Sequence, residues 1–141
     1  MNLALVGEED YFYKRLKSLA EEIGSLVIFT GFVPDEELKI LYQNALAYIF
    51  PSMYEGFGLP PLEAMARGVP VVSSSATSLP EILGEAALYF NPLDVNDMAE
   101  KIKKALLDEG LRNNLIEKGF EQIKKYSWQK MAEETLKIYS K

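Results

Sequence analysis

Residues 51–68 read Pro-Ser-Met-Tyr-Glu-Gly-Phe-Gly-Leu-Pro-Pro-Leu-Glu-Ala-Met-Ala-Arg-Gly. This stretch places two carboxylates, Glu55 and Glu63, on either side of a loop that contains Gly56 and Gly58. An apolar run at 46–50 precedes it and predicts a strand that Pro51 ends, because proline cannot donate to a sheet ladder. Residues 61–67 predict a short helix, which Gly68 can cap. A glycine loop between a strand and a helix N-terminus predicts a polar ligand site at the carboxyl end of the strand.

The same alternation of apolar runs and helical periodicity continues on both sides of this stretch. We expect strands at 3–6, 26–29, 46–50, 69–73 and 86–90, and helices at 11–23, 35–45, 61–67, 95–108, 111–126 and 128–139. This order, without Asn-Gly hairpin signals, predicts a Rossmann-like α/β fold: a doubly wound parallel sheet of about five strands with helices on both faces and the carboxy-terminal helices packed at its end. A length of 141 residues suits one domain.

The residue types of the stretch suit an anionic ligand that carries a diol. Backbone N–H groups at Gly56, at Gly58 and at the helix N-terminus can receive a diphosphate. Glu63, in the first turn of the predicted helix, can accept two hydrogen bonds from vicinal hydroxyls such as those of a ribose. Each carboxylate also has an ordinary explanation: Glu63 can simply complement the helix dipole, and Glu55 can be a solvated loop carboxylate. The fixed spacing of the two around the loop favours the ligand site.

Other residues with a suggestive pattern are better explained by structure. Ser78-Leu79-Pro80-Glu81 has the form of a capping box, in which Ser78 caps a short helix and Glu81 reaches back to it. Three aromatic residues near the carboxyl end, Tyr126, Trp128 and Tyr139, are expected in the core rather than in a ligand site.

Composition excludes several classes of function. The net charge of -6 gives no basic surface for nucleic acid or for an anionic membrane, so neither partner is expected. With no Cys and no His, the chain has no disulfide, no thiol chemistry, no zinc site of the usual kind and no imidazole proton shuttle. We expect no metal and no cofactor. The first residues lack the basic segment of a signal peptide, which predicts a cytoplasmic location.

The run Phe50–Val72 resembles the signature of the group 1 glycosyltransferases, the retaining enzymes that include glycogen synthase and many mannosyltransferases. Four flanking segments agree with the family pattern: Val27–Val33, Ser78–Glu81, Pro92–Asp94 and Tyr126–Trp128. The resemblance covers nearly the whole chain, and the E-x(7)-E motif formed by Glu55 and Glu63 is specific in this context.

The resemblance implies one half of a GT-B architecture, in which two Rossmann-like domains face each other across the active site. The chain looks like most of the carboxy-terminal domain, which binds the nucleotide-diphosphate sugar for metal-independent, retaining transfer. By the family pattern, Glu63 would hold the ribose hydroxyls and Glu55 would be the catalytic residue that contacts the transferred sugar. The remaining donor contacts implied by the family are the backbone of Gly56, Phe57, Gly58 and Leu59 along the sugar and phosphates, and Val33 beside the base.

The chain also departs from the family pattern. We expect residues 1–141 to form a single nucleotide-sugar-binding domain that lacks the family's first strand, with its Arg and Lys phosphate clamp, and the whole amino-terminal acceptor domain. That strand would lie between the strands at 3–6 and 46–50, so these strands close up, a neighbouring chain fills the space, or the chain is a fragment. The chain alone is expected to be inactive.

Three other functions compete with this interpretation. A glycosidase also uses paired carboxylates, but it needs one of them with a raised pKa, and a helix N-terminus lowers the pKa of a nearby Glu. A metal-dependent glycosyltransferase of the other fold would need an Asp-x-Asp triplet, which the sequence lacks. The remaining alternative is a non-catalytic binding or assembly module derived from a glycosyltransferase, which uses exposed sheet surface for association.

Overall fold

The computed structural model describes residues 1–21, 24 and 26–140, and the chain divides into two compact units, Met1–Leu41 and Tyr42–Lys141. Each unit carries parallel strands and helices, so the predicted α/β class with five parallel strands is confirmed. Membership of both units in one domain stays a prediction. None of the described helices is long and apolar enough to cross a membrane.

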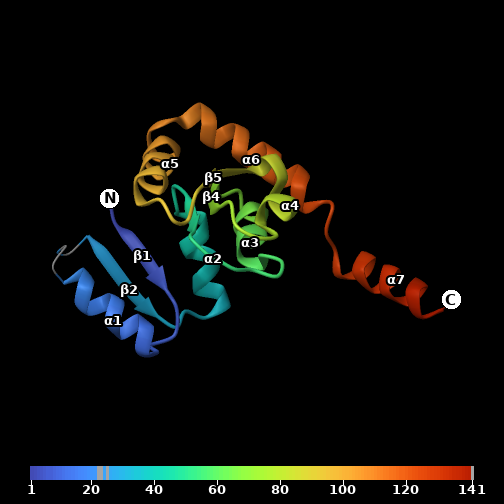
Figure 1. Ribbon diagram of the computed structural model, residues 1–141, viewed down its shortest axis with the longest axis horizontal. Coiled ribbons are helices and arrows are strands. Elements are labelled where there is room, and N and C mark those ends of the chain that lie inside the picture. The colour runs from blue at the N-terminus through green and yellow to red at the C-terminus, as the bar shows by residue number, and fades with distance from the viewer. Residues whose placement is uncertain (22–23, 25, 141) are drawn as a thin grey trace. The chain divides into compact units, whose positions relative to one another are not determined.

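The first unit is a strand, a helix and a strand: β1 (Leu3–Val6), α1 (Tyr11–Ala20) and β2 (Val27–Gly31), shown in blue in Figure 1. β1 pairs in parallel with β2, Leu3 opposite Val27 and Leu5 opposite Phe29. Tyr13 of α1 is buried and meets the Phe29 ring edge-on at 5.2 Å, and the Gly31 N–H donates to its hydroxyl at 2.6 Å. α1 therefore covers the face of the two strands that carries Phe29.

The other face of this pair of strands is open within its unit. Side chains alternate along a strand, so Ala4 and its register partner Ile28 point away from the face that α1 covers. Ala4 is exposed, and Ile28 is 45% exposed. Helix α2 (Asp35–Gln43) follows, beginning in the first unit and ending in the second.

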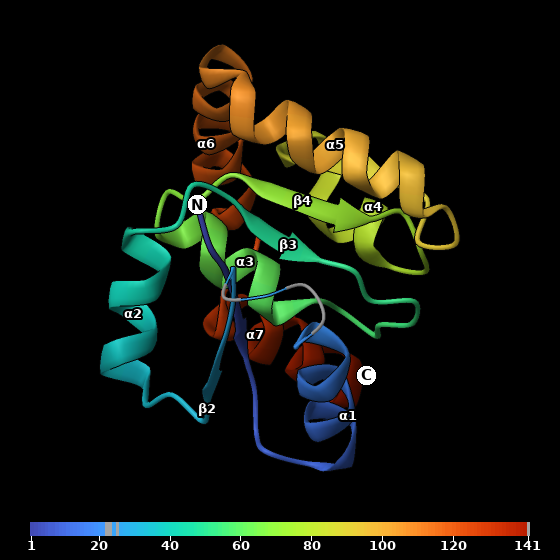
Figure 2. The same ribbon diagram turned by 90° about the vertical axis from the view of Figure 1, so that its left-hand side faces the viewer.

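The second unit contains a three-stranded parallel sheet in the order β3-β4-β5, formed by β3 (Tyr48–Phe50), β4 (Val71–Ser74) and β5 (Ala87–Phe90). Its helices are α3 (Leu59–Ala66), α4 (Leu79–Leu83), a 3-10 turn at Gly84–Ala86, α5 (Val95–Leu107), α6 (Glu109–Ile123) and α7 (Trp128–Tyr139). In Figure 2, α5 and α3 lie on opposite faces of this sheet, as expected for a doubly wound arrangement.

The core of the second unit is built on β4, whose four residues are all fully buried. On the α5 side, Val72, Phe90 and Ala105 form a buried cluster. On the α3 side, α6 packs closely on α3 at Gly119, where a Cβ would lie 3.2 Å from Cγ of the buried Met65. The central strand therefore fixes the positions of both helical layers.

Element bounds differ from the predictions mainly at the ends. The first helix ends at Ala20, and its predicted end at Ile23 lies outside the described residues. α6 ends at Ile123 instead of 126, and β4 begins only after Pro70, which has no N–H for the ladder.

The strands are divided between two sheets. β1 pairs only with β2 among the described strands, and β3 pairs with β4. The three alternatives for the strands at 3–6 and 46–50, namely that they close up, that a neighbouring chain fills the space or that the chain is a fragment, stay predictions.

The expected burial of the carboxy-terminal aromatic residues is only partly right. Trp128 is 72% exposed and Tyr139 is 85% exposed, and α7 has no buried residue, so the prediction is wrong for these two. The spacing of Trp128 and Tyr139 predicts an apolar stripe along a helix, but it does not identify the residues that cover this stripe. Tyr126 is half-buried and belongs to the second unit's packing.

The close packing of α6 on α3 gives a stability prediction. Gly119→Val forces a branched side chain against Met65, whose Cβ and Cγ cannot move away in a filled core, and is expected to lower the free energy of unfolding by about 1–3 kcal/mol. Gly110→Val is the matched control on the same helix, because the nearest atom to its Cβ is an Asp108 oxygen at 3.5 Å. Urea unfolding followed by circular dichroism measures both; equal midpoints for the two variants would contradict the packing.

Candidate functional site

The connection between β3 and α3 contains the predicted site. Gly58 precedes α3 with φ of 98°, and a Cβ there would lie 2.8 Å from Cδ2 of Leu79. A side chain is therefore excluded both by backbone conformation and by space. At Gly56 a Cβ would meet no atom within 4 Å, so the structure gives no steric reason for that glycine and leaves open space above it.

Glu55 lies in the same connection and is half-buried. Its backbone is fixed on both sides by the turn that follows β4. The Glu55 N–H donates to Oγ1 of Thr77 at 3.1 Å, and its carbonyl accepts from the Thr77 hydroxyl at 3.2 Å and from the Ser78 hydroxyl at 2.9 Å. The backbone that carries this carboxylate is thus held by residues more than 20 positions away in sequence.

Glu63 is exposed on α3, and its position differs slightly from the prediction. The helix begins at Leu59 rather than at Pro60 or Pro61, so Glu63 is its fifth residue and lies beyond the first turn. Its interaction with the helix dipole is correspondingly weaker, because the effect falls off within the first turn. No side chain caps this N-terminus by a hydrogen bond. The simple explanation of Glu63 as a dipole partner therefore loses support.

An aromatic cluster that was not predicted from the sequence lies beside Glu63. Tyr42, at the end of α2, meets Tyr48 of β3 at 5.5 Å, and the Tyr48 ring stacks with Phe50 at 6.1 Å. Arg67, at the end of α3, lies 5.2 Å above the Tyr42 ring and donates to the Glu63 carbonyl at 3.0 Å. The sequence pattern that could have predicted the cluster is the pair of aromatic residues at 48 and 50, which lie on the same face of a predicted strand.

The pKa values of the two tyrosines show that both carboxylates act on this cluster. Burial is the largest cause that raises the pKa of Tyr48, followed by Tyr42 and then by the charges of Glu63 and Glu55. Burial also raises the pKa of Tyr42, with Glu63 as the next cause. Both hydroxyls therefore remain protonated near neutral pH. Glu55 and Glu63 are thus both within electrostatic range of Tyr48.

Two further predicted contacts, Phe57 and Leu59, flank Gly58 and are partly exposed. Phe57 is 39% exposed and meets Tyr126 edge-on at 5.4 Å. The Tyr126 hydroxyl donates to the Ile82 carbonyl at 2.9 Å, which ties the ring to the end of α4. Leu59 is 46% exposed. Gly56, Phe57 and Leu59 are thus open to solvent, whereas Gly58 is buried against Leu79.

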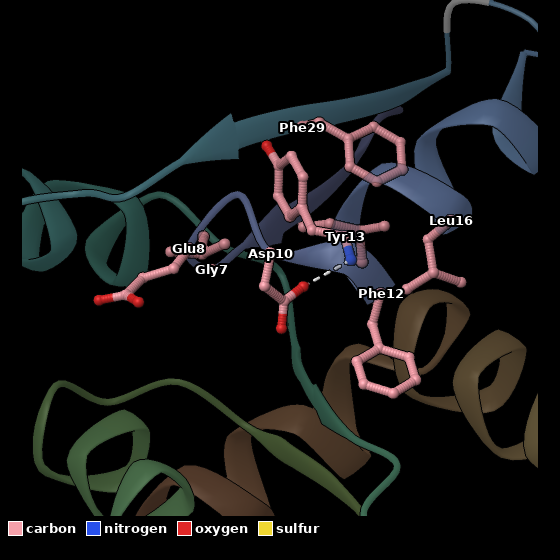
Figure 3. A pocket seen from close by; sticks show the side chains of 9 residues that line it. Gly7, Glu8, Asp10, Phe12, Tyr13, Leu16 and Phe29 are labelled. Atoms are coloured by element: carbon pink, nitrogen blue, oxygen red, sulfur yellow. Dashed lines mark hydrogen bonds between the residues drawn. The ribbon is translucent and has the colours of Figure 1, made fainter.

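Val33 is half-buried in the first unit, between β2 and α2, and its contact with a base stays a prediction. The first unit also has a cavity of about 330 Å³ at the end of β1 (Figure 3). Its lining is mainly apolar, with Phe12, Leu16 and Phe29 among the residues, and its Asp10 carboxylate caps α1 by accepting from the Tyr13 N–H at 2.8 Å. None of the predicted site residues lines this cavity.

The polar groups available at the candidate site are carboxylates, hydroxyls and backbone amides. Within the part of the chain that the structure describes, no group of three His, Cys, Asp or Glu residues could hold a metal ion. The site can accept hydrogen bonds from ligand hydroxyls through Glu55 and Glu63. It can also donate to an anionic group through the backbone at the start of α3.

The chain is similar to known proteins over most of its length. Residues 1–122 match the family described as Glycosyl transferases group 1. The chain is 45% identical over 111 residues to the O-antigen chain mannosyltransferase B of Escherichia coli, covering 79% of this chain and 29% of that protein. It is 44% identical over 122 residues to the serotype-specific mannosyltransferase WbdA of Escherichia coli, covering 84% of this chain and 15% of that protein.

A solved structure supports the fold over nearly the full length. The sucrose-phosphate synthase of Thermosynechococcus elongatus superposes with a TM-score of 0.87 at 31% identity, covering 99% of this chain and 38% of that one. The chain thus spans less than two fifths of the proteins to which it is compared here. With the family match over most of its residues, the chain belongs to the group 1 glycosyl transferases.

Proposed function

We propose that this chain binds the nucleotide-diphosphate sugar donor of a retaining, metal-independent glycosyltransferase. The observation that carries the proposal is the placement of the two carboxylates: Glu55 lies in the loop before α3, with its backbone held by Thr77 and Ser78, and Glu63 lies on α3 itself. One carboxylate in the loop before an uncapped helix N-terminus and one in the second turn of that helix suit a ligand that has hydroxyl groups on both sides of a diphosphate.

The proposal gives each residue a role. Glu63 accepts hydrogen bonds from the ribose hydroxyls, and the backbone of Gly56 to Leu59 lines the sugar and the phosphates. Glu55 contacts the transferred sugar and is the catalytic residue. The curated relatives named above are mannosyltransferases, so a mannosyl donor is the first to test.

Transfer of the sugar to an acceptor needs the second domain of the GT-B architecture, and we do not assign that step to residues 1–141 alone. The chain spans 29% of the E. coli mannosyltransferase B, and the acceptor side of a GT-B site comes from the other domain. The alternative, a non-catalytic assembly module, draws support from the exposed face of β1 and β2 that carries Ala4 and Ile28. The two functions differ in whether the chain recognises a donor.

Calorimetric titration with UDP-, GDP- and ADP-sugars tests donor recognition. At least one sugar nucleotide is expected to bind in the micromolar to millimolar range. Glu63→Ala is expected to weaken that binding about 10- to 100-fold, because hydrogen bonds to a charged group are worth about 1.5–3 kcal/mol. Glu100→Ala, an exposed carboxylate on α5 at the other face of the sheet, is the matched control and should bind as the wild type does. Absence of binding to every nucleotide would favour the assembly module.

Turnover by the isolated chain is a separate prediction. Because the acceptor domain supplies half of the site in this family, release of sugar from any bound donor to an acceptor is expected to stay at the level of a Glu55→Gln control. Product formation is followed by mass spectrometry with the sugar nucleotide that binds best. Robust glycoside formation that Glu55→Gln abolishes would contradict the assignment of this chain as a donor-binding half.

A further inference from the structure

The turn after β4 holds Glu55 instead of capping its own helix. Ser78 precedes α4, but its backbone is helical and its hydroxyl makes no capping hydrogen bond. The predicted capping box of Ser78 and Glu81 is therefore wrong on the serine side. The Ser78 hydroxyl donates to the Glu55 carbonyl at 2.9 Å. Ser78, which was expected to cap its own helix, thus forms a hydrogen bond with a residue of the candidate site.

Thr77 makes a pair of hydrogen bonds with the same residue. Its Oγ1 accepts from the Glu55 N–H at 3.1 Å and donates to the Glu55 carbonyl at 3.2 Å. Thr77 has φ of 49° and is the one non-glycine residue of the described chain with a positive φ. This conformation is unfavourable for a β-branched side chain, and such strain persists where the surrounding contacts require it. The two hydrogen bonds to Glu55 are contacts of that kind.

The next residue, Leu79, supports the other end of the same loop. It is fully buried, and its Cδ2 atom occupies the space beside Gly58 that a Cβ would need. The turn itself is anchored on the sheet. The Ser75 N–H donates to the Phe90 carbonyl at 2.9 Å, and the Ala76 N–H donates to Oγ of the buried Ser74 at 3.0 Å. Residues 75–79 therefore connect the central strand to the loop that contains Glu55.

We infer that Thr77 and Ser78 are positioning residues that fix the backbone of Glu55, so that its carboxylate is presented to the sugar of a bound donor. This inference rests on the proposed function, in which Glu55 contacts the sugar and Glu63 contacts the nucleotide. It predicts that recognition of the sugar and recognition of the nucleotide can be changed separately. Loss of the Thr77 hydroxyl should reduce the preference for a sugar nucleotide over the free nucleoside diphosphate and leave diphosphate binding unchanged.

Three variants separate positioning from folding. Thr77→Gly removes the hydroxyl and adopts a positive φ without strain, so the relief of strain offsets part of the cost of the two lost hydrogen bonds and of the freer unfolded chain. Urea unfolding checks that this variant is folded under the conditions of the binding experiment. Thr77→Ser keeps the hydroxyl and is the conservative control. Ser78→Ala removes the third hydrogen bond to Glu55.

Two measurements on the 141-residue chain test the inference. Amide hydrogen exchange by NMR reports on the Glu55 N–H without any ligand. Thr77→Gly should exchange there about fivefold faster, as expected for one lost hydrogen bond, and Thr77→Ser should match the wild type. Calorimetry with GDP-mannose and GDP, or with the pair that binds best, should show a preference for the sugar nucleotide that falls about fivefold in Thr77→Gly and is unchanged in Thr77→Ser. Ser78→Ala should lower the preference in the same direction.

The outcomes separate the two ideas. Unchanged exchange at the Glu55 amide in Thr77→Gly would overturn the hydrogen-bonded support itself. Faster exchange with an unchanged sugar preference would overturn the positioning role. A wild-type chain that binds GDP-mannose and GDP equally would refute sugar recognition by Glu55. A wild-type chain that binds no nucleotide would refute the proposed function, and the exchange experiment would still show whether Thr77 holds Glu55.

Discussion

The buried strand β4 is the element on which the site depends. Its side chains are fully enclosed between two helical layers, so the chain leaves it at a fixed point and in a fixed direction. The turn that follows is bound to the sheet through Ser74 and Phe90, and it holds the backbone of Glu55 through three hydrogen bonds. These hydrogen bonds anchor the loop that carries Glu55 to the central strand.

Much of this unit could be predicted from the sequence because its signals are local. The apolar run at Val71 and Val72, the proline after Phe50 and the glycine at 58 each act on their own segment of backbone, and the structure has the strands and the helix where they were expected. The E-x(7)-E spacing identified the family before any coordinates. The start of α3 was misplaced by only one or two residues, since Pro is accepted throughout a first helical turn.

The rest depended on partners that are distant in sequence. Ser78 has the residue type of a helix cap, but its hydroxyl finds the Glu55 carbonyl 23 positions earlier. The aromatic cluster needs Tyr42 from one helix and Arg67 from another to meet at Tyr48 and Phe50. The division of five strands between two sheets is set by which edges find a partner, and apolar runs alone do not specify that.

The central claim is that the donor is recognised at the Glu55–Glu63 connection. Chemical-shift mapping of the isotope-labelled chain with a sugar nucleotide tests this most directly, because every amide reports separately. The largest changes are predicted at the Gly56, Gly58 and Glu63 amides, with smaller changes at Thr77. Changes confined to the cavity around Gly7 and Tyr13, with the amides of 55–63 unaffected, would contradict it.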